Sequence, residues 1–258
     1  MPTPKSIQEA LDGHKSIICF VTAGDPDLAA LPEIIDALVR GGADVIEVGI
    51  PFSDPIADGP TIQASSQRAL DSGVTPGAIF EMVSAITCPV PLVAMGYTNT
   101  AMRIGFEAFA NRARQAGFAG VILSDLSPEE SSDWRGAAAM NSLDAIFLVA
   151  PTSTDQRIRM VAEVSSGFVY CVSRTGVTGT GSSAPEDLDA TVRRIRDVTS
   201  LPICVGFGIS RAEHVRKVWD VADGAVVGSL IVDYLQREWN GGSGKDGLIS
   251  LVRSLIEA

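Results

Sequence analysis

The sequence contains few residues of the kinds that hold metals or form disulfides. Among its 258 residues are four cysteines and two histidines, and they form no CxxC, HxH or HExxH pattern. Such short spacings mark most zinc and redox sites, so we expect neither a metal nor a disulfide. Three of the cysteines lie in apolar, strand-like runs, where cysteine acts as a small buried hydrophobic residue in a reducing compartment.

Excess positive charge and long apolar runs are also lacking. The formal net charge is −11, which argues against nucleic acid or an anionic membrane as the main partner. The opening stretch MPTPKSIQEALDGHKS has no apolar signal region, and no later run approaches the length that spans a bilayer. These features predict a soluble cytoplasmic protein. Any anionic ligand must therefore be held by a local binding site that overcomes the repulsion from the negative net charge of the protein.

Short apolar runs rich in β-branched residues recur along the chain. Eight of them start near residues 17, 45, 91, 120, 145, 168, 202 and 224. Their continuous apolarity is typical of parallel strands buried on both faces. Capped amphipathic patterns fill the gaps, among them SPEESSDWRGAAAM, which predicts a helix capped by Ser127. The sequence therefore predicts one α/β domain over 1–258, a (β/α)8 barrel preceded by a helix. A doubly wound open sheet is the alternative, but no GxGxxG follows the first strand.

Two of the gaps between strands are longer than the others. One follows strand 2 and begins with IPFSDPIADGPTI, and the other follows strand 6 and contains RTGVTGTGSSAPED. Both predict extended loops at the carboxyl-terminal face, which carries the chemistry in such barrels. The second segment is rich in Gly, Ser and Thr and is typical of a mobile flap over a site.

Glycines in the last two loops indicate a phosphate site. GFGIS (206–210) closes strand 7, and GSLIV (228–232) closes strand 8 with Gly228 and Ser229 at the start of a helix. Loops in this position commonly hold phosphate through backbone N–H groups, and Ser229 can also cap the helix. Gly179 in the flap adds a possible third amide. Neither loop contains Lys or Arg, so the helix dipole and amides must provide most of the attraction.

Three carboxylates lie in the unusually apolar segment EVGIPFSDPIADGPTI (47–62). Glu47 lies near the end of strand 2, and strand alternation can point it into the barrel. Burial there raises the pKa of a carboxyl group, which suits a general acid–base, although a hydrogen-bonded structural carboxylate is the alternative. Asp58 and Asp54 are both compatible with ordinary turns. Phe20, Tyr97 and Tyr170, at or near strand ends, are either core residues or walls for a flat apolar substrate.

Five segments together resemble a known family. They are FVTAGDP (20–26), EVGIPFSDPIADGPTIQ (47–63), SRTGVTG (173–179), GFGIS (206–210) and GSLIV (228–232). In this order they resemble the α subunit family of tryptophan synthase over nearly the whole chain. The family fold is a single (β/α)8 TIM barrel. The implied reaction is retro-aldol cleavage of indole-3-glycerol phosphate to indole and glyceraldehyde 3-phosphate, without a cofactor or a metal.

The resemblance also implies roles for individual residues. The implied catalytic residues are Glu47, Asp58 and Tyr170. The implied phosphate site consists of Gly179, Phe207, Gly208, Gly228 and Ser229. The implied indole pocket includes Phe20, Tyr97, Thr178 and Ile209. The implied partner is the family's β subunit, a pyridoxal-phosphate enzyme, in an α2β2 complex, with contacts at Pro51, Asp54 and Asn99.

The sequence departs from the family pattern at Thr98, Thr100, Ser124 and Ser127, where an aromatic residue or prolines are common. Several of these positions lie on the side where the β subunit docks, so the departures concern the docking of the partner and not the catalytic residues. Three alternatives stay open: a stand-alone lyase that releases free indole, a sugar-phosphate isomerase on the same barrel, and a degenerate subunit that only activates a partner. The isomerase has no need for PFSDPxADGP, and intact Glu47 and Asp58 count against a degenerate subunit.

Overall fold

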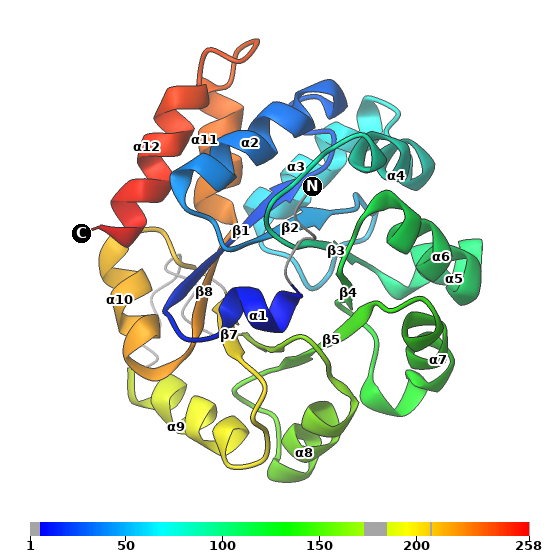
Figure 1. The fold of residues 1–258 in the computed structure, drawn as a ribbon, viewed down its shortest axis with the longest axis vertical. Coiled ribbons are helices and arrows are strands. Elements are labelled where there is room, and N and C mark those ends of the chain that lie inside the picture. The colour runs from blue at the N-terminus through cyan, green and yellow to red at the C-terminus, as the bar shows by residue number, and fades with distance from the viewer. Residues whose placement is uncertain (1–5, 173–184, 207, 258) are drawn as a thin grey trace.

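The fold is a closed barrel of parallel strands surrounded by helices (Figure 1). The computed structural model describes residues 6–172, 185–206 and 208–257, the side chains of 185–187 excepted. The strands are β1 (Ser16–Thr22), β2 (Val45–Gly49), β3 (Leu92–Gly96), β4 (Gly120–Leu123), β5 (Asp144–Val149), β6 (Val169–Val172), β7 (Ile203–Gly206) and β8 (Gly224–Val227). Each begins within one residue of its predicted start, so the predicted (β/α)8 barrel is confirmed and the open sheet is wrong.

The helices follow the order of the chain, and all but the first of them cover the outside of the barrel. They are α1 (Ile7–Leu11), α2 (Leu31–Gly41), α3 (Pro60–Asp71), α4 (Pro76–Ser84), α5 (Thr98–Ile104), α6 (Phe106–Ala116), α7 (Ser132–Met140), α8 (Asp155–Val164), α9 (Pro185–Arg196), α10 (Ala212–Val221), α11 (Ser229–Glu238) and α12 (Lys245–Ile256). Among the described residues, no helix is both long and apolar enough to cross a bilayer. The described part of the chain also contains no cluster of His, Cys, Asp and Glu suited to a metal ion.

The core has two layers because strand side chains alternate between the faces of the sheet. Inward-facing residues such as Ile18, Val93 and Ile122 fill the barrel, while their neighbours on each strand pack against the surrounding helices. Burial on both faces is the reason for the continuous apolar runs in the sequence.

The short helix α1 closes the amino-terminal end of the barrel, which confirms the predicted leading helix. Ser6 and Glu9 form a capping box, in which each side chain bonds the backbone N–H of the other residue. Ile7 and Leu11 are buried in the interior cluster, and Figure 1 shows α1 lying across the middle of the barrel. Among the described residues, α1 thus fills one end of the barrel, and the pocket described below opens at the other, carboxyl-terminal face.

The long gap after β2 contains the predicted extended loop, over 50–59, and two helices, α3 and α4, account for the rest of the gap. One local prediction needs correction. The helix expected from Ser127 begins later, at Ser132, because Pro128–Glu130 form a separate 3-10 turn. Ser127 uses its hydroxyl to bond the Glu130 carboxylate, so the local capping signal stabilises the turn. The predicted flap after β6 lies outside the described residues.

Candidate active site

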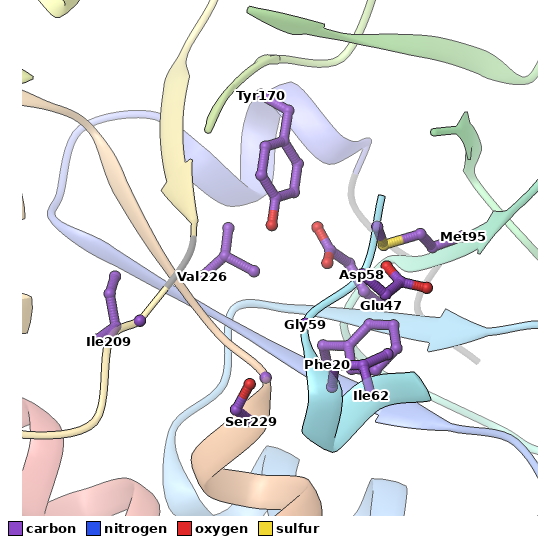
Figure 2. Close-up of a pocket in the computed structure, with 12 residues that line it drawn as sticks. Phe20, Glu47, Asp58, Gly59, Ile62, Met95, Tyr170, Ile209, Val226 and Ser229 are labelled. Atoms are coloured by element: carbon purple, nitrogen blue, oxygen red, sulfur yellow. The ribbon is translucent and has the colours of Figure 1, made fainter. Parts of the chain in front are cut away.

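A pocket opens at the carboxyl-terminal face of the barrel, where the sequence predicts the chemistry (Figure 2). It encloses about 530 Å³ of space, part of it open to solvent. Eight of the predicted site residues line it: Phe20, Glu47, Asp58, Tyr170, Gly208, Ile209, Gly228 and Ser229. These residues come from both ends of the chain, and closure of the barrel brings them together.

Glu47 lies inside the barrel on β2 and is fully buried. Neither of its carboxyl oxygens has a hydrogen-bond partner among the described residues. This burial raises the pKa of Glu47 from 4.5 to about 8, so the carboxyl group holds its proton near neutral pH. A buried structural carboxyl group normally has hydrogen-bonding neighbours, so a buried and unpartnered carboxyl group at a pocket is unusual. It is therefore free to exchange a proton with a bound molecule.

Asp58 ends the loop over 50–59 and lies just before the Gly59 N-cap of α3. The Gln63 side-chain amide donates a 2.8 Å hydrogen bond to the Asp58 carbonyl oxygen, which fixes the backbone there. Burial raises the pKa of the Asp58 carboxyl to about 6, while a hydrogen bond from Tyr97 opposes this rise. The carboxyl is consequently ionised near neutral pH, in contrast to that of Glu47.

Tyr170 extends from β6 toward the two carboxyl groups (Figure 2). Its pKa is raised, first by burial and then by the negative charges of Glu47 and Asp58 nearby. Gly206 on the neighbouring strand makes room for it, since a Cβ atom there would lie 2.1 Å from the Tyr170 hydroxyl oxygen. Gly49 likewise makes room for the Phe20 ring, which a Cβ atom would approach within 2.6 Å. These glycines allow two aromatic walls to stand inside the barrel.

The opposite side of the pocket has the features of an anion site. Gly208 has a φ of +73°, which favours glycine, and Gly228 forms the N-cap of α11. The predicted side-chain cap by Ser229 is wrong, since Ser229 is the first residue of α11 and makes no capping hydrogen bond. No hydrogen bond occupies its hydroxyl among the described residues, and the first backbone N–H groups of an α-helix have no partner within the helix, so both can bind an anion. The predicted residues Thr178, Gly179 and Phe207 lie outside the described residues.

Tyr97 lies beside the pocket and is not among its lining residues. Its ring stacks on Phe52 with centroids 4.9 Å apart, and its hydroxyl oxygen accepts the Ala57 N–H at 3.0 Å. Tyr97 therefore contacts the loop that presents Asp58. Of the residues expected at a partner contact, Asp54 and Asn99 are exposed and Pro51 is buried.

Sequence reasoning missed Gly59, Ile62, Met95 and Val226, which also line the pocket. Met95 and Val226 are strand residues that face the barrel interior. The same alternation of side chains that points Glu47 into the barrel also points Met95 on β3 and Val226 on β8 inward, so the sequence could have identified both. Gly59 and Ile62 belong to the start of α3, and only the position of that helix brings them to the pocket.

Comparisons with known proteins agree with the fold described above. The sequence profile described as "Tryptophan synthase alpha chain" matches residues 8–250. The chain belongs to the tryptophan synthase alpha chain family. The tryptophan synthase alpha chain of Geobacter sp. (strain M21) is 50% identical over 227 residues, covering 87% of this chain and 85% of that protein. That of Geobacter sulfurreducens is 48% identical over 228 residues, or 88% and 86% of the two chains.

Solved structures agree in fold. A tryptophan synthase structure from Mycobacterium tuberculosis superposes with a TM-score of 0.87 at 36% identity, covering 99% of this chain and 98% of that one. The tryptophan synthase subunit alpha from Legionella pneumophila superposes with a TM-score of 0.89 at 30% identity, covering 97% of each chain. The resemblance found from the five sequence segments is thereby confirmed.

Membership of the tryptophan synthase alpha chain family defines the reaction. The chain is a lyase that cleaves indole-3-glycerol phosphate in tryptophan biosynthesis, as predicted. The alpha chain has no cofactor of its own, and pyridoxal phosphate belongs to the β subunit with which the family forms complexes. Nothing in the comparisons favours a stand-alone lyase.

Proposed function

We propose that Glu47 transfers the protons of the cleavage reaction and that Asp58 stabilises the positive charge that develops on the indole ring. One observation carries this proposal. Glu47 is buried without a hydrogen-bond partner among the described residues, in the same pocket as a second carboxyl group whose pKa is lower. Two carboxyl groups with separated pKa values provide an acid and an anion at the same pH.

The first step protonates the indole ring. The neutral carboxyl of Glu47 gives its proton to C3 of the ring, and the ring nitrogen becomes positively charged. The ionised carboxyl of Asp58 accepts a hydrogen bond from the ring N–H and stabilises this charge. The low exposure of the site strengthens that attraction, because water no longer screens the two charges.

The second step breaks the carbon–carbon bond. The Glu47 carboxylate, now ionised, takes the proton of the hydroxyl group on the carbon next to the ring. The electron pair of that O–H bond forms the aldehyde C=O, and the C–C pair returns to the ring and neutralises its nitrogen. Indole and glyceraldehyde 3-phosphate leave, and Glu47 has regained its proton. The Tyr170 hydroxyl, beside both carboxyl groups, helps to orient the glycerol chain.

The substrate lies across the pocket in this proposal. Its ring contacts Phe20 and the apolar side chains of Met95 and Ile209, and its phosphate contacts Gly208, Gly228 and Ser229. No Lys or Arg is among the described residues that line the pocket, so the N-terminus of α11 supplies the attraction for the phosphate. Thr178, Gly179 and Phe207 complete this contact set in the family pattern.

We further propose that the chain works as one domain in a cytoplasmic α2β2 complex. Asp54 and Asn99 are exposed, and Ile56, two residues after Asp54, has 85% of its surface exposed. In this complex, docking of the β subunit over the loop 50–59 would bury the apolar Ile56 side chain, as partners do at the core of an interface. The described cysteines are all unpaired, in keeping with a reducing compartment.

The test is indole release from indole-3-glycerol phosphate by the purified chain, alone and with a β subunit. Glu47→Gln and Asp58→Asn should each lower the rate about a hundredfold or more. Glu163→Gln, which changes an exposed carboxylate on α8, is the control and should leave the rate unchanged. A Glu47→Gln variant with half the normal activity would overturn the assignment. A large rate increase on adding β supports the complex, and no increase contradicts it.

A further inference from the structure

Helix α3 begins directly after Asp58, and two side-chain pairs fix it to the end of β1. The Arg68 guanidinium donates two hydrogen bonds to Asp25, from Nε to Oδ1 at 2.9 Å and from Nη2 to Oδ2 at 2.7 Å. One turn earlier on the helix, the hydroxyl oxygens of Ser65 and Thr22 lie 2.6 Å apart. We call these four residues the α3 clamp.

The clamp is buried at the side that faces β1. Asp25 has 4% of its surface exposed, and Thr22 and Ser65 are more completely buried. Bidentate pairing of this kind fixes the direction as well as the distance between two groups. Lysine cannot reproduce it, because an ammonium group has no planar fork.

Backbone packing strengthens the same contact. Gly24, between Thr22 and Asp25, has a φ of +93°. A Cβ atom there would lie 2.6 Å from Val74 and 3.2 Å from Ala69 on α3. The loop after β1 therefore fits closely against α3 and the turn that follows it.

The clamp is connected to both carboxyl groups of the pocket. Thr22 pairs in register with Gly49, two residues after Glu47 on β2. At the other end, Gln63 on α3 bonds the carbonyl oxygen of Asp58. Glu47 is part of the sheet, whereas Asp58 is carried by a loop and a helix outside it. The clamp is thus a direct structural tie between the element that holds Asp58 and the strand beside Glu47.

We propose that the α3 clamp positions Asp58 against the ring of the substrate, so that Asp25, Thr22, Ser65 and Arg68 are positioning residues of the cleavage reaction. None of the four lines the pocket, so their effect must pass through Asp58. The inference rests on the role proposed above for Asp58. A clamp that served stability alone would affect all ligands and all backgrounds alike.

The first test compares Arg68→Lys with Ser65→Ala, a milder change that removes the second pair. Arg68→Lys should lower kcat about tenfold and Ser65→Ala about threefold. Indole should bind about threefold more weakly and KM should rise by a similar factor, because indole and the substrate present the same ring N–H to Asp58, while glycerol 3-phosphate, held by α11, should bind as before. Arg196→Lys is the matched control, since Arg196 pairs with Asp223 near the amino-terminal ends of the strands, and it should change none of these values.

The second test repeats both changes in an Asp58→Asn background, with enzyme in excess so that slow single turnovers are measured. Without the carboxylate, the clamp has nothing to position, so Arg68→Lys should have less than about a twofold further effect. The inference is overturned if Arg68→Lys lowers the rate equally in the wild-type and Asp58→Asn backgrounds, or if the affinities for indole and glycerol 3-phosphate fall together. Should Asp58→Asn itself retain full activity, the proposed role of Asp58 fails. If Asp58→Asn loses activity while Arg68→Lys and Ser65→Ala retain it, the clamp inference fails and the proposed role of Asp58 stands.

Discussion

The hydroxyl oxygen of Tyr97 accepts a 3.0 Å hydrogen bond from the backbone N–H of Ala57, the residue before Asp58. The ring also stacks on Phe52, at the start of the same loop. A hydrogen bond from Tyr97 to the Asp58 carboxyl lowers the pKa of that group against the effect of burial. One side chain at the end of β3 therefore holds both ends of the loop and favours the ionised form of Asp58.

Tyr97→Phe keeps the stacked ring and removes both hydrogen bonds. Loss of a hydrogen bond to an ionised group should lower kcat/KM about tenfold. Because that bond lowers the pKa of Asp58, its loss should raise this pKa and move the acidic limb of the rate profile to higher pH. Steady-state rates of indole formation over a pH series measure both effects.

Tyr234→Phe is the matched control for this change. Its hydroxyl donates to the Gly244 carbonyl oxygen at 2.9 Å, away from the pocket. The control should leave the acidic limb where it is. An unchanged limb in Tyr97→Phe would show that Tyr97 only packs against the loop over 50–59 and does not set the pKa of Asp58.

Tyr97 also illustrates what the sequence can predict. The strands were predictable because burial on both faces leaves an unbroken apolar run. Glu47 was predictable because a carboxylate within such a run is costly unless it has a role. The direction of the Tyr97 ring was not, since it depends on where the loop over 50–59 folds back. Pairs such as Asp25 and Arg68, which are 43 positions apart, leave no periodic signal in a single sequence.

The two carboxyl groups should give a bell-shaped dependence of kcat/KM on pH. Activity should rise as Asp58 loses its proton around its pKa of about 6 and fall as Glu47 loses its proton around its pKa of about 8. The maximum therefore lies between these two values. Initial rates of indole formation from about pH 5 to about pH 9 provide the measurement. A rate that keeps rising through the basic range would contradict Glu47 as the proton donor.

Glu47 should also make the stability of the fold depend on pH. Its folded pKa of about 8 exceeds the ordinary value of 4.5, so the folded state favours the neutral carboxyl. The contribution of that neutral form is fully present below 4.5 and is lost as the pH rises through about 8. Glutamine removes this titration, so Glu47→Gln should be more stable than wild type near neutral pH, by roughly 3 kcal/mol.

Denaturant unfolding near pH 5 and near pH 7 measures this effect. The stability advantage of Glu47→Gln should be small at the lower pH and grow as the pH rises. Glu163→Gln, on the exposed side of α8, should show no such trend. If the stability advantage of Glu47→Gln over wild type is equal at both pH values, then a difference in packing causes it and ionisation of Glu47 does not.

The anion site makes the last prediction, because Ser229 has its hydroxyl at the pocket and no capping hydrogen bond. Ser229→Ala should raise KM for indole-3-glycerol phosphate about tenfold, the usual effect of losing one hydrogen bond to a charged group. The phosphate does not change during cleavage, so kcat should stay within about twofold of wild type. Ser250→Ala, which removes a hydroxyl bonded to the Asp246 carbonyl on α12, should change neither constant. A fall in kcat with constant KM would place Ser229 at the reacting end of the substrate, and the phosphate would then have to bind elsewhere in the pocket.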